Sequence, residues 1–508
     1  MEKRTSNEPA ASTKEDLYDV KGEGLPAAAQ DVVLGEMLEV DATPEQERKV
    51  RLKLDLVLLP MMAACYMMQY MDKYVLSQAT LFNLRQDLNL VGDQFNWTSA
   101  IFYFGYLVWS WPSSYLMVRL PIGKYLSVCV FLWGGFLLCH AAAKNFAGLM
   151  TARFFLGVGE AAIAPGFSLV VGMFYTREEQ PARQAAWYLG NCVANLISGV
   201  VVYGIGNITI HTVAQWQLIF LILGAITASL AFWLVALLPD SPKNAIFLNK
   251  KERAIALQRT LRNKTGVMDV DSFKWNQVWL AFKDPQTWFL VLYNFCVNLC
   301  NGGITSFSSI LINGFGYGRL RSLLMQMPMG AAQIVFLVIT SGVATYVKST
   351  RIAMMMFTTS LSMMGMILIW KLDADNKAGR LTGLTFGGVF AVNIPLSLSL
   401  VSSNVAGFTK RSVISAMIFV AYCVGNIVGP QFYLESEEPD YPTGIKAAMC
   451  GLILGIFFLF CLMVYYIWEN RRRDALYGPP SLMTENEELE QDLSNKTDQE
   501  MESFRYVI

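Results

Sequence analysis

The chain has 508 residues, of which 54% are hydrophobic and only 16% are charged, whereas a soluble globular protein averages about 25% charged residues. This composition indicates that much of the chain lies in lipid and argues against an ordinary soluble domain. Lys and Arg total 40, as do Asp and Glu, so the net charge is zero and no basic field indicates a nucleic-acid partner.

The chain opens with a polar stretch, residues 1–53, which is rich in Glu, Asp, Lys, Pro and Ala. Such a composition is typical of a disordered tail, and it contains no apolar core of a secretory signal. We therefore expect a disordered cytoplasmic tail before the first long apolar segment, which begins near Leu54.

Twelve apolar segments follow, each close to the roughly 20 residues that a helix needs to cross a bilayer. The expected spans are 54–79, 96–118, 122–142, 147–173, 184–205, 215–238, 286–308, 321–346, 352–370, 380–402, 412–433 and 446–468. A polar linker, residues 239–285, divides them into six and six, and its stretch "KKERAIALQRTLR" predicts a short surface helix. We expect an all-α membrane protein with two pseudo-symmetric six-helix bundles, 54–238 and 286–468, followed by a cytoplasmic tail over 469–508.

The positions of Lys and Arg predict which end faces the cytoplasm. The linker is basic, four basic residues precede the first span, and Arg471–Arg473 follow the last one. With twelve spans these three segments fall on one side, so we expect cytoplasmic termini. The acidic loop Leu434–Pro442 and the Asn-x-Thr sequons at Asn96 and Asn207 fall on the other side. Both sequons lie against the membrane, which disfavours glycosylation.

Motifs for common energy sources and catalytic sites are missing from the sequence. No G-x-x-x-x-G-K-[ST] loop indicates ATP hydrolysis, and no nucleophile elbow or H-E-x-x-H motif indicates an enzyme. The nine cysteines fall in apolar runs, and no histidine accompanies Cys296 and Cys300, so we expect core cysteines and no metal or cofactor. A transporter is favoured over a channel, a receptor or a membrane enzyme.

The first span contains two adjacent ionisable residues in "QYMDKYVLSQA". Because neighbouring side chains on a helix point about 100° apart, Asp72 and Lys73 do not both face one cavity. An ionisable group at mid-bilayer costs roughly 2.5–3.5 kcal/mol, so it usually faces a cavity or a partner. Lys73 could offer a cation to a carboxylate substrate, with Gln69 as a further contact, and Asp72 is a candidate for proton coupling that pairs with another helix. The alternative is an ion pair near the outer end of the span.

The fourth span contains Arg153 and Glu160 in "RFFLGVGEAAIAP". Seven residues rotate by 700°, only 20° short of two turns, so the two side chains point the same way and lie about 10 Å apart along the axis. That separation disfavours a direct salt bridge, so each is expected to meet another helix or a central cavity. Arg153 could instead snorkel to the surface, and Glu160 could form a buried hydrogen bond. A proton-coupling role for Glu160 is favoured because a carboxyl group in an apolar site can exchange protons near neutral pH.

The second half offers amides, and we expect no charged residue inside its six spans. The candidates for substrate binding are Asn294, Asn298 and Asn301 of span seven and Tyr422 and Asn426 of span eleven. The three asparagines of span seven share one helical face and lie beside an expected helix break at Gly302–Gly303. Amides in membrane helices also serve only to hold helices together, which is the alternative. Gly383 and Gly387 of span ten predict close helix packing.

Four stretches of the sequence together resemble the fungal allantoate permease family, anion:cation symporters of the major facilitator superfamily. These are "YMDKYVLSQAT", "RFFLGVGEAAIAPGFSLVVGMFY", "EEQPARQAAWYLGNCVANLISG" and "NVAGFTKRSVISAMIFVAYCVGNIVGPQFY". The resemblance extends from about Arg51 to the end of the chain and includes "LSNKTDQEMESFRYVI".

The resemblance implies a major facilitator fold, alternating access, a plasma-membrane location, a monomer, and proton-driven import of a small organic anion such as allantoate or a vitamin carboxylate. Relatives use an Arg and a Glu seven residues apart in span four for anion binding and proton coupling, and Arg153 and Glu160 match them. Lys73 replaces an arginine of the family's span-one motif and loses the fork that grips a carboxylate. The gating loop after span two keeps Arg119 and Lys124 without an aspartate.

Two other functions remain open at this point. The same fold serves exporters of fungal secondary metabolites, and a related protein could sense a nutrient without moving it. The short cytoplasmic tails argue mildly against a sensor.

Overall fold

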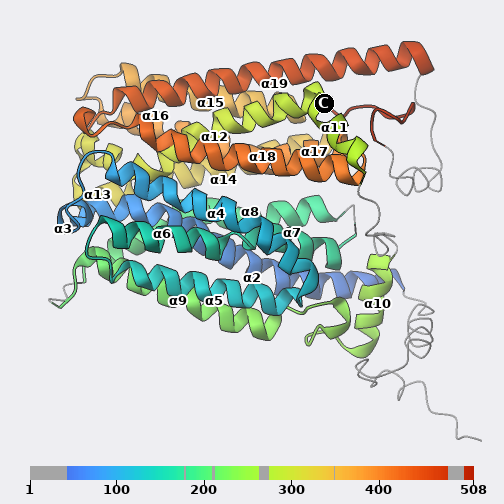
Figure 1. Ribbon diagram of the computed structural model, residues 1–508, viewed down its shortest axis with the longest axis horizontal. Coiled ribbons are helices and arrows are strands. Elements are labelled where there is room, and N and C mark those ends of the chain that lie inside the picture. The colour runs from blue at the N-terminus through green and yellow to red at the C-terminus, as the bar shows by residue number, and fades with distance from the viewer. Residues whose placement is uncertain (1–42, 177–178, 209–211, 262–273, 348, 479–496) are drawn as a thin grey trace, which may run out of the picture.

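The computed structural model describes residues 43–176, 179–208, 212–261, 274–347, 349–478 and 497–508, and over these residues the chain is helical without strands. The helices run side by side along one axis, with the N-terminal half below the C-terminal half in Figure 1. We call the end that carries α10 (Lys250–Leu261), α11 (Trp275–Lys283) and residues 497–508 the linker end. The opposite end, with α3 (Leu84–Asp87) and α13 (Arg319–Leu324), is the far end.

The first half contains the six expected spans. They are α2 (Pro44–Ala79), α4 (Gln94–Arg119), α5 (Ile122–His140), α6 (Phe146–Glu160) with α7 (Ile163–Phe174), α8 (Gln180–Gly206) and α9 (Gln215–Leu237), and η2 (Thr80–Phe82) follows α2. The helix α2 starts earlier than expected because Thr43 and Gln46 form a reciprocal capping box at its first turn. Residues 44–53 are therefore helical, which corrects the expected tail; residues 1–42 lie outside the described part of the chain.

The second half contains the other six spans, several of them in two pieces. They are α12 (Pro285–Ile312) with η5 (Asn313–Tyr317), α13 with α14 (Met327–Tyr346), α15 (Arg351–Lys371), α16 (Lys377–Gly387) with η6 (Val389–Asn393) and α17 (Ile394–Asn404), α18 (Phe408–Val428) with η7 (Gly429–Phe432), and α19 (Pro442–Tyr477). The short elements η3 (Pro242–Asn244) and η8 (Glu435–Glu437) lie in connections.

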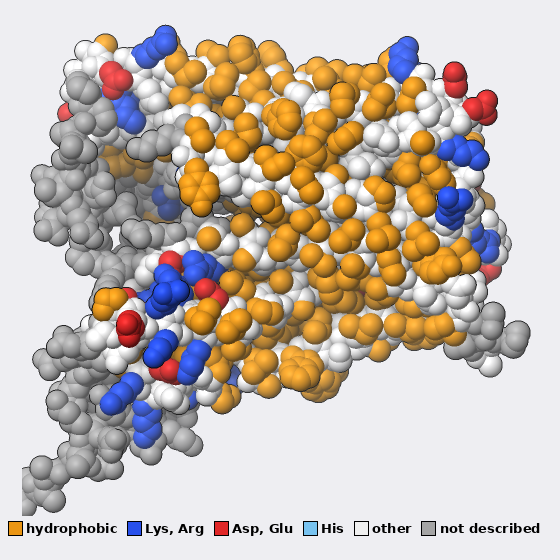
Figure 2. Space-filling model, turned by 180° about the vertical axis from the view of Figure 1, so that it is seen from behind, with side chains coloured by type: hydrophobic (Ala, Val, Ile, Leu, Met, Phe, Trp, Pro, Cys, Tyr) orange, Lys and Arg blue, Asp and Glu red, His pale blue; other side chains and the backbone are white. Residues whose placement is uncertain are grey.

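The surface fits a bilayer. Figure 2 shows hydrophobic side chains over the middle of one face, whereas Lys, Arg, Asp and Glu gather at its two ends. Ten spans in the described residues are long and apolar enough to cross a membrane by length and composition. The remaining two, α2 and α4, are long but more polar, and both lie where the halves meet. Several of their polar residues, such as Gln78 and Asn96, are buried against protein instead of facing lipid.

The expected helix break at Gly302–Gly303 is wrong, because α12 runs unbroken through both glycines. Their lack of a side chain serves packing instead. A Cβ on Gly302 would lie 2.8 Å from the carbonyl oxygen of Asn426, and one on Gly303 would overlap the ring of Tyr433. The irregular backbone comes later, in η5, where Gly316 has φ of 85°. The expected close packing in span ten is confirmed, since a Cβ on Gly383 would lie 2.7 Å from the carbonyl oxygen of Gly365.

The linker helix α10 is confirmed as a surface helix, and ion pairs hold it against the first half. Arg259 of α10 lies 2.7 Å from Glu179, which also pairs with Arg51 of α2 at 3.3 Å. Glu252 of α10 lies 2.6 Å from Lys53. Burial alone disfavours ionised Glu179, but Arg259, the Thr176 amide and Arg51 outweigh this effect and hold its pKa below the usual value.

The docking of α10 should therefore depend on the charge of Glu179. Because the pKa of Glu179 is lowered from 4.5, its ionised form stabilises docking above pH 4.5, and this contribution is lost as the pH falls below that value. We expect Glu179→Gln to increase the mobility of a spin label at Lys251→Cys at neutral pH and to reduce its acid dependence to the part that the Glu252–Lys53 pair contributes. Glu45→Gln, an exposed change on α2, serves as the control. Equal mobility in all three proteins would contradict this assignment.

Candidate functional site

The centre of the first half holds four ionisable side chains, two from α2 and two from α6. Asp72 and Glu160 are fully buried, Arg153 is 3% exposed, and the side chain of Lys73 is 12% exposed. Ionisable groups inside a membrane protein require partners or a solvated cavity, so their contacts indicate what each one does.

Lys73 and Glu160 form an ion pair between α2 and α6, with 3.3 Å between Nζ and Oε2. The sequence predicted that Glu160 meets another helix but did not identify Lys73 as its partner. The ammonium group of Lys73 also lies 5.2 Å from the centre of the Phe102 ring and 5.5 Å from that of Tyr106, both on α4. These aromatic faces stabilise the cation without neutralising it.

Small residues around Glu160 make room for this pair. A Cβ on Gly157 would overlap the carbonyl oxygen of Phe102 on α4, and a Cβ on Gly159 would lie 3.0 Å from Trp133 on α5. The span also divides at Ala161–Ala162, so Glu160 is the last residue of α6. The glycines thus allow α4 and α5 to close around the carboxyl group and exclude water from it.

Arg153 faces the interior, so the alternative that it snorkels to the surface is wrong. Its Nε donates a hydrogen bond to the carbonyl oxygen of Thr98 at 3.3 Å, and its guanidinium lies 5.6 Å from the centre of the Phe102 ring. Its Nη1 is buried and has no hydrogen-bond partner among the described residues. Arg153 therefore keeps a donor that an anion could use.

Asp72 turns away from Lys73, as helical phase predicted. Thr227 of α9 donates a hydrogen bond to Asp72 Oδ2 at 3.4 Å, so the carboxyl group ties α2 to α9. This buried contact excludes the alternative of an ion pair with Lys73 at the end of the span. Gln69 lies one turn before Lys73 and is buried, with Nε2 unpaired in the described part of the chain.

The amides of the second half bond mainly to one another. Asn301 donates to Asn426 at 2.8 Å, and Asn426 donates to Asn298 at 3.1 Å, which links α12 to α18. Asn294 donates to the carbonyl oxygen of Leu290 and, at 3.4 Å, to Ser397 of α17. The structure therefore brings three predicted amides together in contacts that hold helices, as the alternative proposed.

Aromatic residues complete the centre, and the sequence reasoning did not select most of them. Tyr103 of α4 packs with its ring centre 5.9 Å from that of the predicted Tyr422, and Tyr106 lies 5.4 Å from Phe419. These pairs join the two halves through α4 and α18. The sequence feature that could have identified them is the run "IFYFGYLVW", in which Phe102 and Tyr106 lie four residues apart on one helical face.

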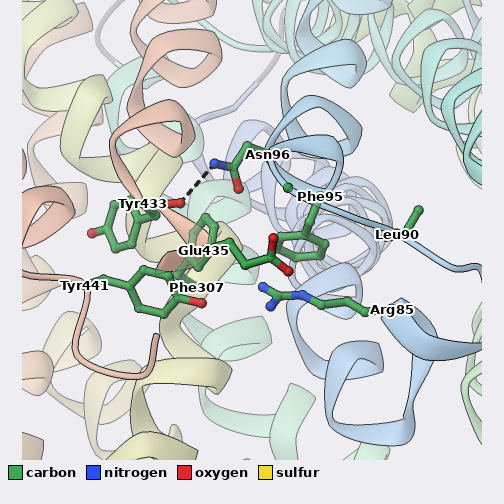
Figure 3. Close-up of a pocket in the computed structure, with 9 residues that line it drawn as sticks. Arg85, Leu90, Phe95, Asn96, Phe307, Tyr433, Glu435 and Tyr441 are labelled. Atoms are coloured by element: carbon green, nitrogen blue, oxygen red, sulfur yellow. Dashed lines mark hydrogen bonds between the residues drawn. The ribbon is translucent and has the colours of Figure 1, made fainter. Parts of the chain in front are cut away.

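The far end is closed by contacts between the halves. Figure 3 shows Arg85 and Phe95 of the first half facing Phe307, Tyr433 and Tyr441 of the second. The Arg85 guanidinium lies 4.4 Å from the centre of the Phe95 ring, and its Nη1 lies 3.0 Å from Glu438. The rings of Phe307 and Tyr433 stack with their centres 4.5 Å apart.

Asn96 belongs to the same closure. Its Nδ2 donates to the carbonyl oxygen of Tyr433 at 3.0 Å, and the side chain is buried, so this sequon is inaccessible to glycosylation here. Deeper in the far end, Gln78 of α2 donates to Gln326 at 2.9 Å, and the amide of Ser309 donates to Ser77 at 3.3 Å. The second sequon includes Thr209, which lies outside the described residues.

The loop after span two lacks an aspartate of its own, and an aspartate from the connection after α9 takes its place. Asp240, beyond α9, accepts hydrogen bonds from the backbone amides of Gly123 at 2.9 Å and Lys124 at 3.2 Å. These are amides of the first turn of α5, which need an acceptor. The contact joins the first turn of α5 to the segment that follows α9, both at the linker end of the molecule.

Comparison with known proteins gives a consistent result. The chain matches the Major Facilitator Superfamily over residues 62–430. It is 38% identical to an uncharacterized transporter of Schizosaccharomyces pombe, over 92% of this chain and 88% of that one. It is 32% identical to the allantoate permease of Saccharomyces cerevisiae, over 93% of this chain and 89% of the permease. The xylose transporter XylE of E. coli has the same fold, with a TM-score of 0.61, 14% identity, and 80% and 97% of the two chains covered.

The Lys73–Glu160 pair should show energetic coupling. Removing one member leaves the other charge buried without its partner, whereas removing both does not. We expect the double variant to lose less free energy of unfolding than Lys73→Met and Glu160→Gln lose in sum. The difference, which is the coupling energy, should be about 0.5–3 kcal/mol. Unfolding of the purified proteins in detergent measures it. Additive effects would show that the two groups do not interact.

The far-end closure should weaken when Arg85 is removed. Arg85→Ala eliminates the ion pair with Glu438 that joins the halves, worth at most about 1 kcal/mol, or roughly a fivefold change in the population of the opened form. We expect a membrane-impermeant maleimide to label Ser308→Cys correspondingly faster from the far side, in a background without the exposed Cys139 and Cys450. Arg119→Ala at the other end of α4 is the control, and equal rates would contradict the closure.

Proposed function

Since the chain belongs to the major facilitator superfamily, in the fungal family of the allantoate permease, and is a secondary transporter, we propose that it imports a small organic anion together with protons. Allantoate, or a vitamin carboxylate of similar size, represents the proposed substrate class. The linker end would face the cytoplasm and the far end the outside of the plasma membrane, in agreement with the basic linker and the acidic loop Leu434–Pro442.

The buried Lys73–Glu160 pair carries this proposal. In the empty transporter each charge neutralises the other. A substrate carboxylate can form an ion pair with Lys73 only if Glu160 loses its negative charge. Glu160 loses that charge when it binds a proton. Two states then leave neither Lys73 nor Glu160 ionised without a counter-charge: the empty pair, and the anion on Lys73 beside protonated Glu160. Because other combinations leave a charge buried alone, reorientation is confined to these two states and couples anion to proton.

Arg153 would act as a second cation for the same anion. Its free Nη1 donor supports this role, and both cations lie over one ring, that of Phe102. Gln69 offers a neutral amide donor one turn from Lys73. Asp72 faces Thr227 on the other side of α2, so we assign the coupling proton to Glu160 and a positioning role to Asp72.

The second half would close the site from the opposite side. Tyr422 reaches Tyr103 across the interface, and behind it the amide chain of Asn298, Asn301 and Asn426 fixes α12 against α18. We propose that Tyr422 contacts the body of the substrate, whereas these amides keep its helix in place. An aromatic wall beside two cations suits a small carboxylate with an amphipathic body.

The decisive test measures proton-driven accumulation separately from exchange. In a permease-deficient yeast supplied with a panel of radiolabelled carboxylates, we expect the unmodified protein to accumulate its substrate and an uncoupler to abolish accumulation. Glu160→Gln should lose accumulation yet retain exchange of internal for external substrate, because its uncharged side chain leaves Lys73 available. Lys73→Met should lose both activities because it lacks the cation.

Asp373→Asn, a change of an exposed carboxylate between α15 and α16, is the matched control and should transport normally. Accumulation by Glu160→Gln that still responds to the uncoupler would overturn the proton assignment. Outward movement of the labelled compounds under the same gradient would overturn import in favour of export. Binding without any flux would indicate a sensor.

A further inference from the structure

The last residues of the chain form part of the C-terminal half. A cytoplasmic tail was expected over 469–508, but α19 continues to Tyr477, and residues 497–508 fold back onto the linker end of the same half. Asp498 is fully buried there, and Met501 and Tyr506 are at most 9% exposed. We call residues 497–508 the strap.

A buried charge cluster anchors the beginning of the strap. Asp498 lies 2.7 Å from Nζ of Lys410, which lies 2.6 Å from Asp284, and all three side chains are fully buried. Gln286 at the start of α12 donates to both carboxylates. Sequence reasoning missed Lys410 because it was expected to precede span eleven, whereas α18 begins at Phe408. Lys410 is the shared cation of two buried carboxylates, so its removal would leave both of them without a counter-charge.

The end of the strap is anchored by Tyr506. Its ring stacks on Tyr466 of α19, with centres 4.9 Å apart and planes 6° apart, and its hydroxyl donates to Asp498 at 2.7 Å. Burial and the Asp498 carboxylate raise the pKa of Tyr506, so the hydroxyl remains a donor. Arg473 of α19 donates to the carbonyl oxygens of residues 498, 501 and 504 and thereby fixes the backbone between the two anchors.

The strap also grips the turn between α17 and α18. Asn404, the last residue of α17, donates to the carbonyl oxygen of Val507 and accepts from its amide, both at 2.7 Å. Gly407 in the turn has φ of 88°, and a Cβ there would lie 3.0 Å from Thr497. Arg351 joins the same assembly, since its backbone amide donates to Ile508 and its guanidinium to Ser403 of α17 at 2.7 Å.

From these contacts we propose that residues 497–508 are an intramolecular strap that positions the linker-end half of α17 for transport. The strap contacts α17 through two hydrogen bonds between the side-chain amide of Asn404 and the backbone of Val507, while its own position is fixed by α12, α18 and α19 through Lys410, Gln286 and Tyr466. At its other end α17 continues from η6, where Ala391 accepts a 2.7 Å hydrogen bond from Tyr188 of the first half. α17 thus connects the strap to the interface between the halves.

If residues 497–508 only stabilised the fold, their loss would have a different effect on hydrogen exchange. Loss of such a segment would lower the protection of the whole C-terminal half equally. Loss of a positioning strap would loosen residues 394–410 and leave the far-end part of the same half unchanged. Hydrogen exchange separates the two because it reports local opening segment by segment. This measurement needs no substrate, so its result is independent of the proposed function.

The test uses the full chain in nanodiscs with two variants. Tyr506→Ala removes the stack and the hydrogen bond to Asp498, and Asn404→Ala removes the side-chain hydrogen bonds between α17 and Val507 of the strap. We expect both to raise amide exchange over 394–410 by roughly tenfold, and Tyr506→Ala also over 497–508. The exposed Glu502→Gln, within the strap, should exchange as the unmodified protein does.

Unchanged exchange over 394–410 in both variants would overturn the proposal. An equal rise in exchange across the whole second half, including the far-end part of α12, would overturn it as well, because that result indicates only global destabilisation. A rise confined to 394–410 and the strap supports it. Where the substrate is known, the same variants should transport more slowly, in proportion to the loosening of α17.

Discussion

The arrangement of this transporter depends on a charged pair that has been removed from water. Lys73 and Glu160 lie 3.3 Å apart in an interior closed by aromatic rings and small residues. An unpaired charge in this interior is unfavourable in free energy, so the state of one member of the pair restricts the state of the other. This environment disfavours any state in which Lys73 or Glu160 is ionised without a counter-charge, and in the proposed function an anion on Lys73 together with a proton on Glu160 replaces the pair.

The two halves contribute differently around this pair. In the described residues the first half supplies the central charges, on α2 and α6, and the glycines that let neighbouring helices surround them. The second half supplies Tyr422 and an amide chain through Asn426, whose bonds join α12 to α18. Its own charge cluster, around Lys410, lies at the linker end and holds the strap. The first half thus has its buried ion pair at its centre, whereas the second half has its buried charge cluster at the linker end.

Contacts that join the two halves and contacts that stabilise the second half lie at opposite ends of the molecule. At the far end, weak contacts such as Arg85 with Glu438 join the halves, and partly exposed ion pairs of this kind break readily. At the linker end, buried and multiply bonded groups such as Asp498 fix parts of one half to each other. The far-end contacts thus join the two halves and also include the buried hydrogen bonds of Asn96 and Gln78, whereas the linker-end cluster joins elements within one half.

The sequence alone determined the spans, their division into six and six, and the shared direction of Arg153 and Glu160, because hydropathy and helical phase are local properties. Helical phase also predicted that the side chains of Asp72 and Lys73 point in different directions. The sequence did not reveal that Lys73 is the partner of Glu160, because contacts between helices depend on how they pack. The tertiary structure decided this pairing, the mutual bonding of the Asn298 and Asn426 amides, and the docking of the strap. A polar, charged segment resembles a free tail unless the buried partners of Asp498, far away in the chain, are known.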